Sequence, residues 1–155
     1  MTRFKFRLAP VQRLREETRD HARQELARAV QAEQILAERI DDLNQEIQAL
    51  VEQVRQGQRQ GQVEVDRILD LRRYELILKV QRAEITQNRN EVEQEVERRR
   101  QLLAEADREV RVLEQLKENQ QTEWQRNEER AEQKSLDEIA SLQHFRGDVM
   151  RGYQS

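Results

Sequence analysis

The sequence has no cysteine, one proline and four glycines, and few of its residues are apolar. Without cysteine it can form neither a disulfide framework nor a thiolate zinc site. Only 35% of the 155 residues are hydrophobic and 4% are aromatic, which is too little to fill a compact globular core. No stretch approaches the roughly 20 apolar residues that span a bilayer. The cations near the N-terminus are not followed by the apolar run of a secretory signal. We therefore expect a cytoplasmic chain without direct membrane insertion.

Charged residues and glutamine together make up about half of the sequence. Asp, Glu, Lys and Arg account for 38% of the chain, and there are 22 glutamines, yet the net charge is only -3. Most of these residues are good helix formers, and the composition is typical of a coiled coil. Residues 1–15 carry five cations and no acid. Because the rest of the chain has no basic field, we expect no nucleic-acid partner.

Proline and glycine divide the chain into two helical segments. Pro10 suits the first turn of a helix, where its missing N–H costs nothing. Gly57 and Gly61 interrupt the pattern in the middle of the chain. We predict one coiled-coil domain over residues 1–155, in these parts: an entry segment 1–9, a helix 10–56, a turn 57–62, a helix 63–146 and a tail 147–155.

Both segments carry apolar residues at heptad spacing, the signature of helices that pack along a common seam. In the first segment the seam residues are Leu36, Ile40, Leu43, Ile47, Leu50 and Val54. An earlier stripe at four-residue spacing contains Leu14, Thr18, Ala22 and Leu26. In the second segment the seam residues are Ile68, Leu71, Leu78, Ile85, Val92, Val96, Arg99, Leu103, Ala106, Val110 and Leu113.

The short break between the segments favours an antiparallel helical hairpin over one continuous helix that dimerises in parallel. With a turn centred near residue 59, position i faces about position 118 minus i, so Val11 lies beside Asp107. The second helix then extends about 40 residues beyond its partner. This overhang carries an apolar stripe that we expect to contact another protein: Val110, Leu113, Leu116, Trp124, Leu136, Ile139, Leu142, Phe145 and Val149.

Motifs of catalysis are missing. Gly57 and Gly61 have neither the spacing nor the lysine of a P-loop, and no GxSxG, HExxH or calcium-loop pattern occurs. The two histidines, His21 and His144, lie far apart in the sequence. Carboxylates are spread evenly along solvated helices, which gives no reason for a tuned pKa. We expect no enzyme activity, no cofactor and no metal site.

Both ends of the chain resemble the flagellar FliJ family, the small coiled-coil component of the flagellar type III export apparatus. Residues 4–8, Val11 and residues 14–16 resemble the start of that family, and residues 132–140 are similar to its C-terminal signature. The position of Gly61, followed by Tyr74 and Leu78, also resembles the family pattern. The similarity extends over essentially the whole chain.

The resemblance implies an antiparallel two-helix coiled coil, similar to the central stalk of rotary ATP synthases, at the cytoplasmic face of the inner membrane at the flagellar base. It implies three partners: the hexameric flagellar export ATPase, the membrane export-gate protein and export chaperones. The implied gate-binding residues are Tyr74, Leu78, Gln81 and Ile85. The implied ATPase-ring residues are Phe4, Phe6, Arg7, Arg15, Trp124, Gln133, Lys134, Asp137, Glu138 and Ile139.

Other interpretations stay open at this point. Leu78 and Ile85 are also regular heptad positions and can be core residues. Phe4 and Phe6 can fold back over the second helix near residue 110. The chain as a whole can be a homo-oligomeric coiled-coil scaffold, the equivalent stalk of a virulence-type secretion system, or a nucleic-acid binder with a basic arm. As a stalk it should be a monomer or a weak homo-oligomer.

Overall fold

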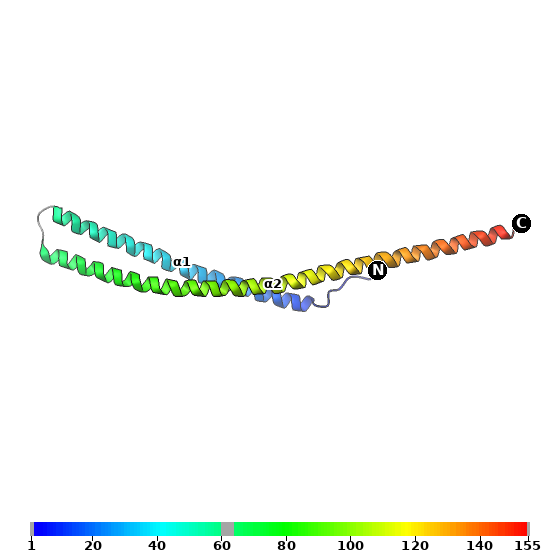
Figure 1. Cartoon of the computed structure of the whole chain (residues 1–155), viewed down its shortest axis with the longest axis horizontal. Coiled ribbons are helices and arrows are strands. Elements are labelled where there is room, and N and C mark those ends of the chain that lie inside the picture. Colours follow the sequence, from blue (N-terminus) through cyan, green and yellow to red (C-terminus); the bar gives the residue numbers. More distant parts are fainter. Residues whose placement is uncertain (1, 60–63, 155) are drawn as a thin grey trace. The chain divides into compact units, whose positions relative to one another are not determined.

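The computed structural model describes residues 2–59 and 64–154. Two α-helices account for nearly all of them: α1 (Ala9–Arg59), of 51 residues, and α2 (Val65–Gly152), of 88 residues. Figure 1 shows that they pack against each other in opposite directions. The prediction of an all-α antiparallel hairpin with a longer second helix is therefore confirmed.

Both helices continue through glycines at which the sequence suggested breaks. Gly57 lies inside α1, and Gly147 lies inside α2. A Cβ atom built on either glycine meets nothing within 4 Å. A glycine costs a helix only about 1 kcal/mol relative to alanine, which favourable neighbours outweigh. Helix α1 thus ends three residues later than expected, and α2 six residues later. Gly61 and the second half of the expected turn, residues 60–62, lie outside the described residues.

The chain divides into two compact units. One unit, here called the hairpin unit, comprises Glu17–Asp107. The other, here called the terminal unit, comprises Met1–Glu16 together with Arg108–Ser155. The first holds most of α1 with the first half of α2, and the second holds the two ends of the chain.

The hairpin unit is built around the predicted heptad seams. Its central cluster joins Leu43, Ile47 and Leu50 of α1 to Leu78 of α2. Leu71 and Ile85 pack against this cluster from α2. The α1 seam over residues 36–54 is confirmed, since each of its six residues is buried or half-buried. The stripe at four-residue spacing that begins at Leu14 is only partly buried, because Leu14 is exposed whereas Ala22 and Leu26 are half-buried.

Charged residues complete the α2 seam at positions that the apolar pattern left blank. The buried and half-buried positions alternate at three- and four-residue spacing: 68, 71, 75, 78, 82, 85, 89 and 92. Glu75, Arg82 and Arg89 belong to this series. Arg82 donates to the side-chain oxygen of Asn44 at 2.8 Å, and Arg89 donates to Glu33 at 3.2 Å. Polar groups thus bridge the two helices inside the seam.

These bridges give the register of the hairpin unit. The residue numbers of its bonded pairs, Asn44 with Arg82, Glu33 with Arg89 and Glu25 with Arg99, add to 126, 122 and 124. The expected value of 118 is too small by about six. The reason is the length of α1: the midpoint between its end at Arg59 and the start of α2 at Val65 is residue 62, not 59.

In the terminal unit the same shift places Arg15 within 2.9 Å of Glu109. The segment before α1 also follows α2 (Figure 1), and the Thr2 hydroxyl donates to Glu128 at 3.0 Å. Val110 is consequently buried, and Leu113, Leu116 and Trp124 are half-buried. The prediction that these four belong to an unpaired overhang is wrong. The fully exposed stretch is shorter and extends from residue 129 to 154.

Candidate partner-binding surfaces

The four gate-candidate residues lie in two different environments. Tyr74 and Gln81 are exposed, and the relative exposure of Tyr74 is 49%. Leu78 is only 2% exposed and belongs to the central cluster of the hairpin unit. Ile85 is half-buried against the same cluster. Only Tyr74 and Gln81 are therefore accessible to a partner while the hairpin is intact.

Helical periodicity explains this division. Residues seven apart lie on nearly the same side of a helix, so Leu78 and Ile85 both face α1. Tyr74 and Gln81 are also seven apart and lie together at one edge of the seam. Ile77 shares this side, three residues after Tyr74, and is exposed. Sequence reasoning missed Ile77 because it lies outside the seven-residue series.

The N-terminal aromatic residues gather on the second helix in the terminal unit. The ring centroids of Phe4 and Trp124 are 6.1 Å apart and the rings are tilted by 49°, a geometry in the favourable range for aromatic pairs. Phe6 is buried. Phe4 thus folds back over α2 as expected, but it reaches Trp124 and not the expected position near residue 110. The two aromatic residues half-exposed here, Phe4 and Trp124, remain available to a partner.

The charged members of the ring-candidate set are exposed. Arg7 is free of the helix, before α1 begins, and Arg15 forms the ion pair with Glu109. In the C-terminal signature, Gln133 donates to Asp137 at 3.1 Å along the same helix. Lys134 and Glu138 are exposed. The structure brings all ten ring-candidate residues into one unit but distributes the C-terminal ones around the helix instead of on one side.

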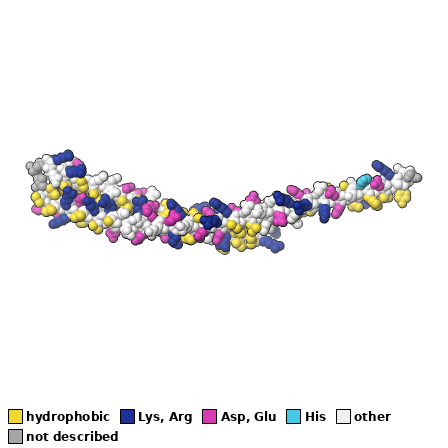
Figure 2. Space-filling view, viewed as in Figure 1, with side chains coloured by type: hydrophobic (Ala, Val, Ile, Leu, Met, Phe, Trp, Pro, Cys, Tyr) yellow, Lys and Arg dark blue, Asp and Glu magenta, His cyan; other side chains and the backbone are white. Residues whose placement is uncertain are grey.

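A broad apolar stripe occupies about half of the circumference of α2 from Leu136 to the end of the helix. Figure 2 shows hydrophobic side chains along this part of the helix. We name it the C-terminal stripe, and its members are Leu136, Ile139, Leu142, Phe145, Val149 and Tyr153, all of them exposed. Such a contiguous patch on an otherwise polar chain marks an interaction surface. Ile139 is the one residue that belongs to both this stripe and the ring-candidate set.

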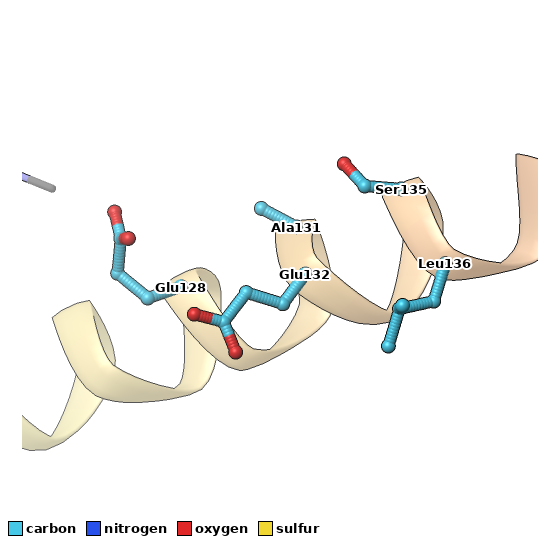
Figure 3. Close-up of a pocket in the computed structure, with 5 residues that line it drawn as sticks. All are labelled: Glu128, Ala131, Glu132, Ser135 and Leu136. Carbon is cyan, nitrogen blue, oxygen red and sulfur yellow. The ribbon is translucent and has the colours of Figure 1, made fainter. Parts of the chain in front are cut away.

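The surface of α2 is slightly hollowed at the start of the C-terminal stripe. A shallow depression is lined by Glu128, Ala131, Glu132, Ser135 and Leu136, and Figure 3 shows that all five come from consecutive turns of α2. A single helix can wall a ligand on one side only, whereas small-molecule sites bury most of the ligand. The depression suits contact with a partner protein.

The ionisable groups show structural rather than catalytic arrangements. Glu75 is buried between Lys79 and Arg72, each with a nitrogen 2.9 Å from its carboxylate. Hydrogen bonds from Lys79 and then Arg72 lower the pKa of Glu75. Hydrogen bonds from Arg98 and Arg99 lower the pKa of Glu95 to about 2. Both carboxylates are held ionised, a state that suits ion pairing.

Residues 2–59 and 64–154 contain neither a metal-ligand group nor a helix that could span a membrane. Within those ranges, histidine and acidic side chains do not form a group of three or more that could hold a metal ion. His144 lies 3.6 Å from Asp148 with both side chains exposed. No helix in the same ranges is long and apolar enough to cross a membrane.

Comparison with known proteins identifies the family. The sequence model of the family described as "Flagellar FliJ protein" matches residues 4–148. No curated protein and no solved structure matches the chain. The match includes both end motifs, the whole of the hairpin unit and most of the C-terminal stripe. The chain therefore belongs to the flagellar FliJ family, whose members are non-catalytic components of the flagellar export apparatus.

Proposed function

We propose that this chain is the stalk of the flagellar export apparatus, which binds the hexameric export ATPase through its terminal unit and the membrane export gate through α2. In this role it couples ATP hydrolysis to export without contributing a catalytic residue. It acts at the cytoplasmic face of the inner membrane at the flagellar base. Membership of the flagellar FliJ family supports the flagellar system over a virulence-type one.

The observation that carries the proposal is the C-terminal stripe. From residue 129 to 154 every residue is exposed, yet six large apolar side chains lie within about half of the circumference of the helix. An isolated helix in water gains nothing from such a stripe, because helices owe most of their stability to burial of the apolar side. A ring with an apolar inner surface would cover the stripe. The half-exposed Phe4 and Trp124 extend the same contact.

The gate contact is proposed at the exposed edge of the hairpin seam. Tyr74 and Gln81 make the direct contacts, and Ile77 between them adds apolar area. Aromatic residues are favoured anchors of protein interfaces. Leu78 and Ile85 act from within, because their packing against the central cluster holds this side of α2 in place. The export chaperones bind the chain in the same proposal, which co-elution of a purified chaperone with the chain would test.

The ring contact is tested by ATP turnover of the purified export ATPase, with and without the chain. We expect stimulation by the intact chain and loss of stimulation when residues 132–155 are removed. Leu142→Glu and Phe145→Glu should each reduce stimulation several-fold. Ala140→Glu is the matched control, since it adds the same charge about 160° from Leu142 and about 140° from Phe145 around the helix. Equal effects of all three variants, or no stimulation by the intact chain, would refute the ring contact.

The gate contact is tested by titrating the cytoplasmic part of the gate protein with the chain. Tyr74→Ala should weaken binding about tenfold or more, as expected for an aromatic anchor, and leave the helical circular-dichroism signal unchanged. Leu78→Ala should weaken binding and also lower thermal stability, because it opens the core. Leu102→Ala, at another exposed apolar position of α2, is the control. If Tyr74→Ala melts the hairpin, Tyr74 is a core residue and the assignment fails.

A further inference from the structure

A second heptad stripe lies on α2, near the start of the helix. Its members follow one another at four-, three-, four- and three-residue spacing: Leu69, Arg73, Leu76, Val80 and Ala83. We name it the outer stripe. The relative exposures of Leu69, Leu76 and Val80 are 48%, 62% and 66%. Figure 2 shows hydrophobic side chains gathered where α2 begins.

The outer stripe faces away from α1. At 100° per residue, Leu76 lies about 160° around the helix from Leu78, which is buried against α1. The hairpin seam and the outer stripe therefore occupy opposite sides of one helix. Helix α1 cannot cover the outer stripe while it packs on the seam. The 4-3-4-3 spacing is that of a seam for a further helix, rather than of a flat contact surface.

The two flanks of the outer stripe differ in charge. The residues that follow Leu69, Leu76 and Ala83 are Asp70, Ile77 and Glu84. The residues that precede Arg73 and Val80 are Arg72 and Lys79. One flank is therefore acidic around Ile77, and the other is basic. All of these side chains belong to the hairpin unit.

This asymmetry selects the orientation of a second helix with the same sequence. In a parallel pair, the basic flank of one helix faces the acidic flank of the other. Lys79 of one copy then lies opposite Glu84 of the second copy, and the two-fold axis repeats the contact. In an antiparallel pair each flank faces itself, so that Arg72 approaches Lys79 and Asp70 approaches Glu84. Like charges at that distance oppose association.

We propose that the outer stripe binds a second copy of this chain, and that the two α2 helices pair in parallel over residues 69–83. The charged flanks are self-complementary in this orientation alone. The contact extends over about 21 Å of helix, which is short for a stable dimer. Arg73 lies inside the stripe and meets its own copy, although Asp70 lies 3.9 Å from its guanidinium. A weak, reversible dimer is the result.

Sedimentation equilibrium of the full chain over a wide range of concentration tests the proposal without any other component. The wild type should associate reversibly to a dimer. Leu76→Glu should abolish association, and Glu84→Lys should weaken it several-fold. Arg73→Leu should tighten it at least about tenfold, the factor that corresponds to about 1.4 kcal/mol. Leu102→Glu places the same charge at another exposed apolar site of α2 and should leave association unchanged.

The orientation is tested by disulfide formation, which a chain without cysteine makes possible. Leu69→Cys and Ala83→Cys, each alone, should form disulfide-linked dimers, because equivalent seam positions meet in a parallel pair within disulfide reach. Cross-linking only in a mixture of the two variants would indicate an antiparallel pair and overturn the proposal.

Three further results, two from sedimentation and one from binding to the gate protein, would also overturn the proposal. The first is a wild type that stays monomeric at every concentration. The second is an association constant that Arg73→Leu leaves unchanged. The third is a monomeric chain in which Leu76→Glu abolishes binding to the export-gate protein, which would assign the outer stripe to that partner. Circular dichroism of each variant shows that loss of association is not loss of the hairpin.

Discussion

Single residues in the seam divide the work of stabilising the hairpin and of fixing its register. Leu43, Ile47 and Leu50 supply buried apolar area, whereas Arg82 and Arg89 form hydrogen bonds to α1. Partly buried polar pairs add little net stability, but a shifted register leaves them unpaired. A purely apolar seam could slide by one heptad at little cost. The arginines make such a slide unfavourable.

Two aliphatic residues of α1 should respond very differently to truncation. Leu43 is 0% exposed, and Ile35 is 59% exposed. Leu43→Ala should lower the free energy of unfolding by about 2–5 kcal/mol, because it leaves a cavity in the core. Ile35→Ala should change it by less than about 0.5 kcal/mol. Urea unfolding followed by circular dichroism measures both. Similar losses in the two variants would contradict the burial described for the seam.

Glu95 should make part of the hairpin stability depend on pH. Its carboxyl accepts hydrogen bonds from Arg98 and Arg99, and its pKa falls from 4.5 to about 2 on folding. Because the folded pKa is lower, the stabilisation is fully present above pH 4.5 and is lost as the pH falls toward 2. Thermal midpoints of wild type and Glu95→Gln should therefore differ at pH 7 and converge near pH 2. A constant difference at all pH values would argue against the ion pairs.

At the scale of the helix, the length of α1 depends on whether the helix continues through Gly57. The glycine lies inside the helix, with open space where a Cβ would be. Gly57→Ala should therefore raise the free energy of unfolding by up to about 1 kcal/mol. Thermal unfolding measures the change, and Gly147→Ala is the control that should raise helical content without shifting the hairpin midpoint. A decrease for Gly57→Ala would place the turn at residue 57 after all.

Periodicity made the hairpin and most of its core predictable. Leu71, Leu78 and Ile85 repeat every seven residues, and this repeat holds in the structure. The register was not predictable, because a glycine that ends a helix and a glycine that a helix tolerates look the same in one sequence. Glu75 and Arg82 were missed as seam positions, since charged residues usually mark the solvated side.

The candidate sites were predictable to a smaller extent. Exposure of Tyr74 and burial of Leu78 follow from their different places in the heptad. Only the resemblance to the flagellar FliJ family predicted that both belong to one gate-binding site. Coverage of Trp124 by the N-terminal segment could not be predicted, because residues 2–8 are not helical and have no periodicity. A contact between distant parts of the chain, such as Phe4 with Trp124, depends on the register that the sequence left open.

At the scale of the whole molecule, packing is uneven between the two units. The hairpin unit holds the central cluster and its polar bridges. The terminal unit buries Phe6 and Val110 but leaves residues 129–154 exposed. Apolar side chains of the hairpin unit are thus buried within the fold, whereas those at the end of the terminal unit are exposed and can bind partners. This division suits a protein that must keep its structure while it is free.

Removal of residues 132–155 should therefore lower the helical content but leave the stability of the hairpin unchanged. The deletion takes away 21 of the 139 residues in α1 and α2. The helical circular-dichroism signal should fall by about 15% in that proportion, while the thermal midpoint of the remaining chain stays within about 2 °C of wild type. A large drop in the midpoint would reveal packing of this segment on the rest of the molecule.

The exposed end of α2 also has a kinetic consequence. Its backbone hydrogen bonds close within single turns, and no side chain from residue 129 to 154 is buried. Opening a turn there breaks no tertiary contact, so the local opening free energy is small. Amide hydrogens of this segment should exchange with deuterium far sooner than those around Leu43. A bound partner would slow that exchange along the C-terminal stripe, so the time course of deuterium uptake would map its footprint residue by residue.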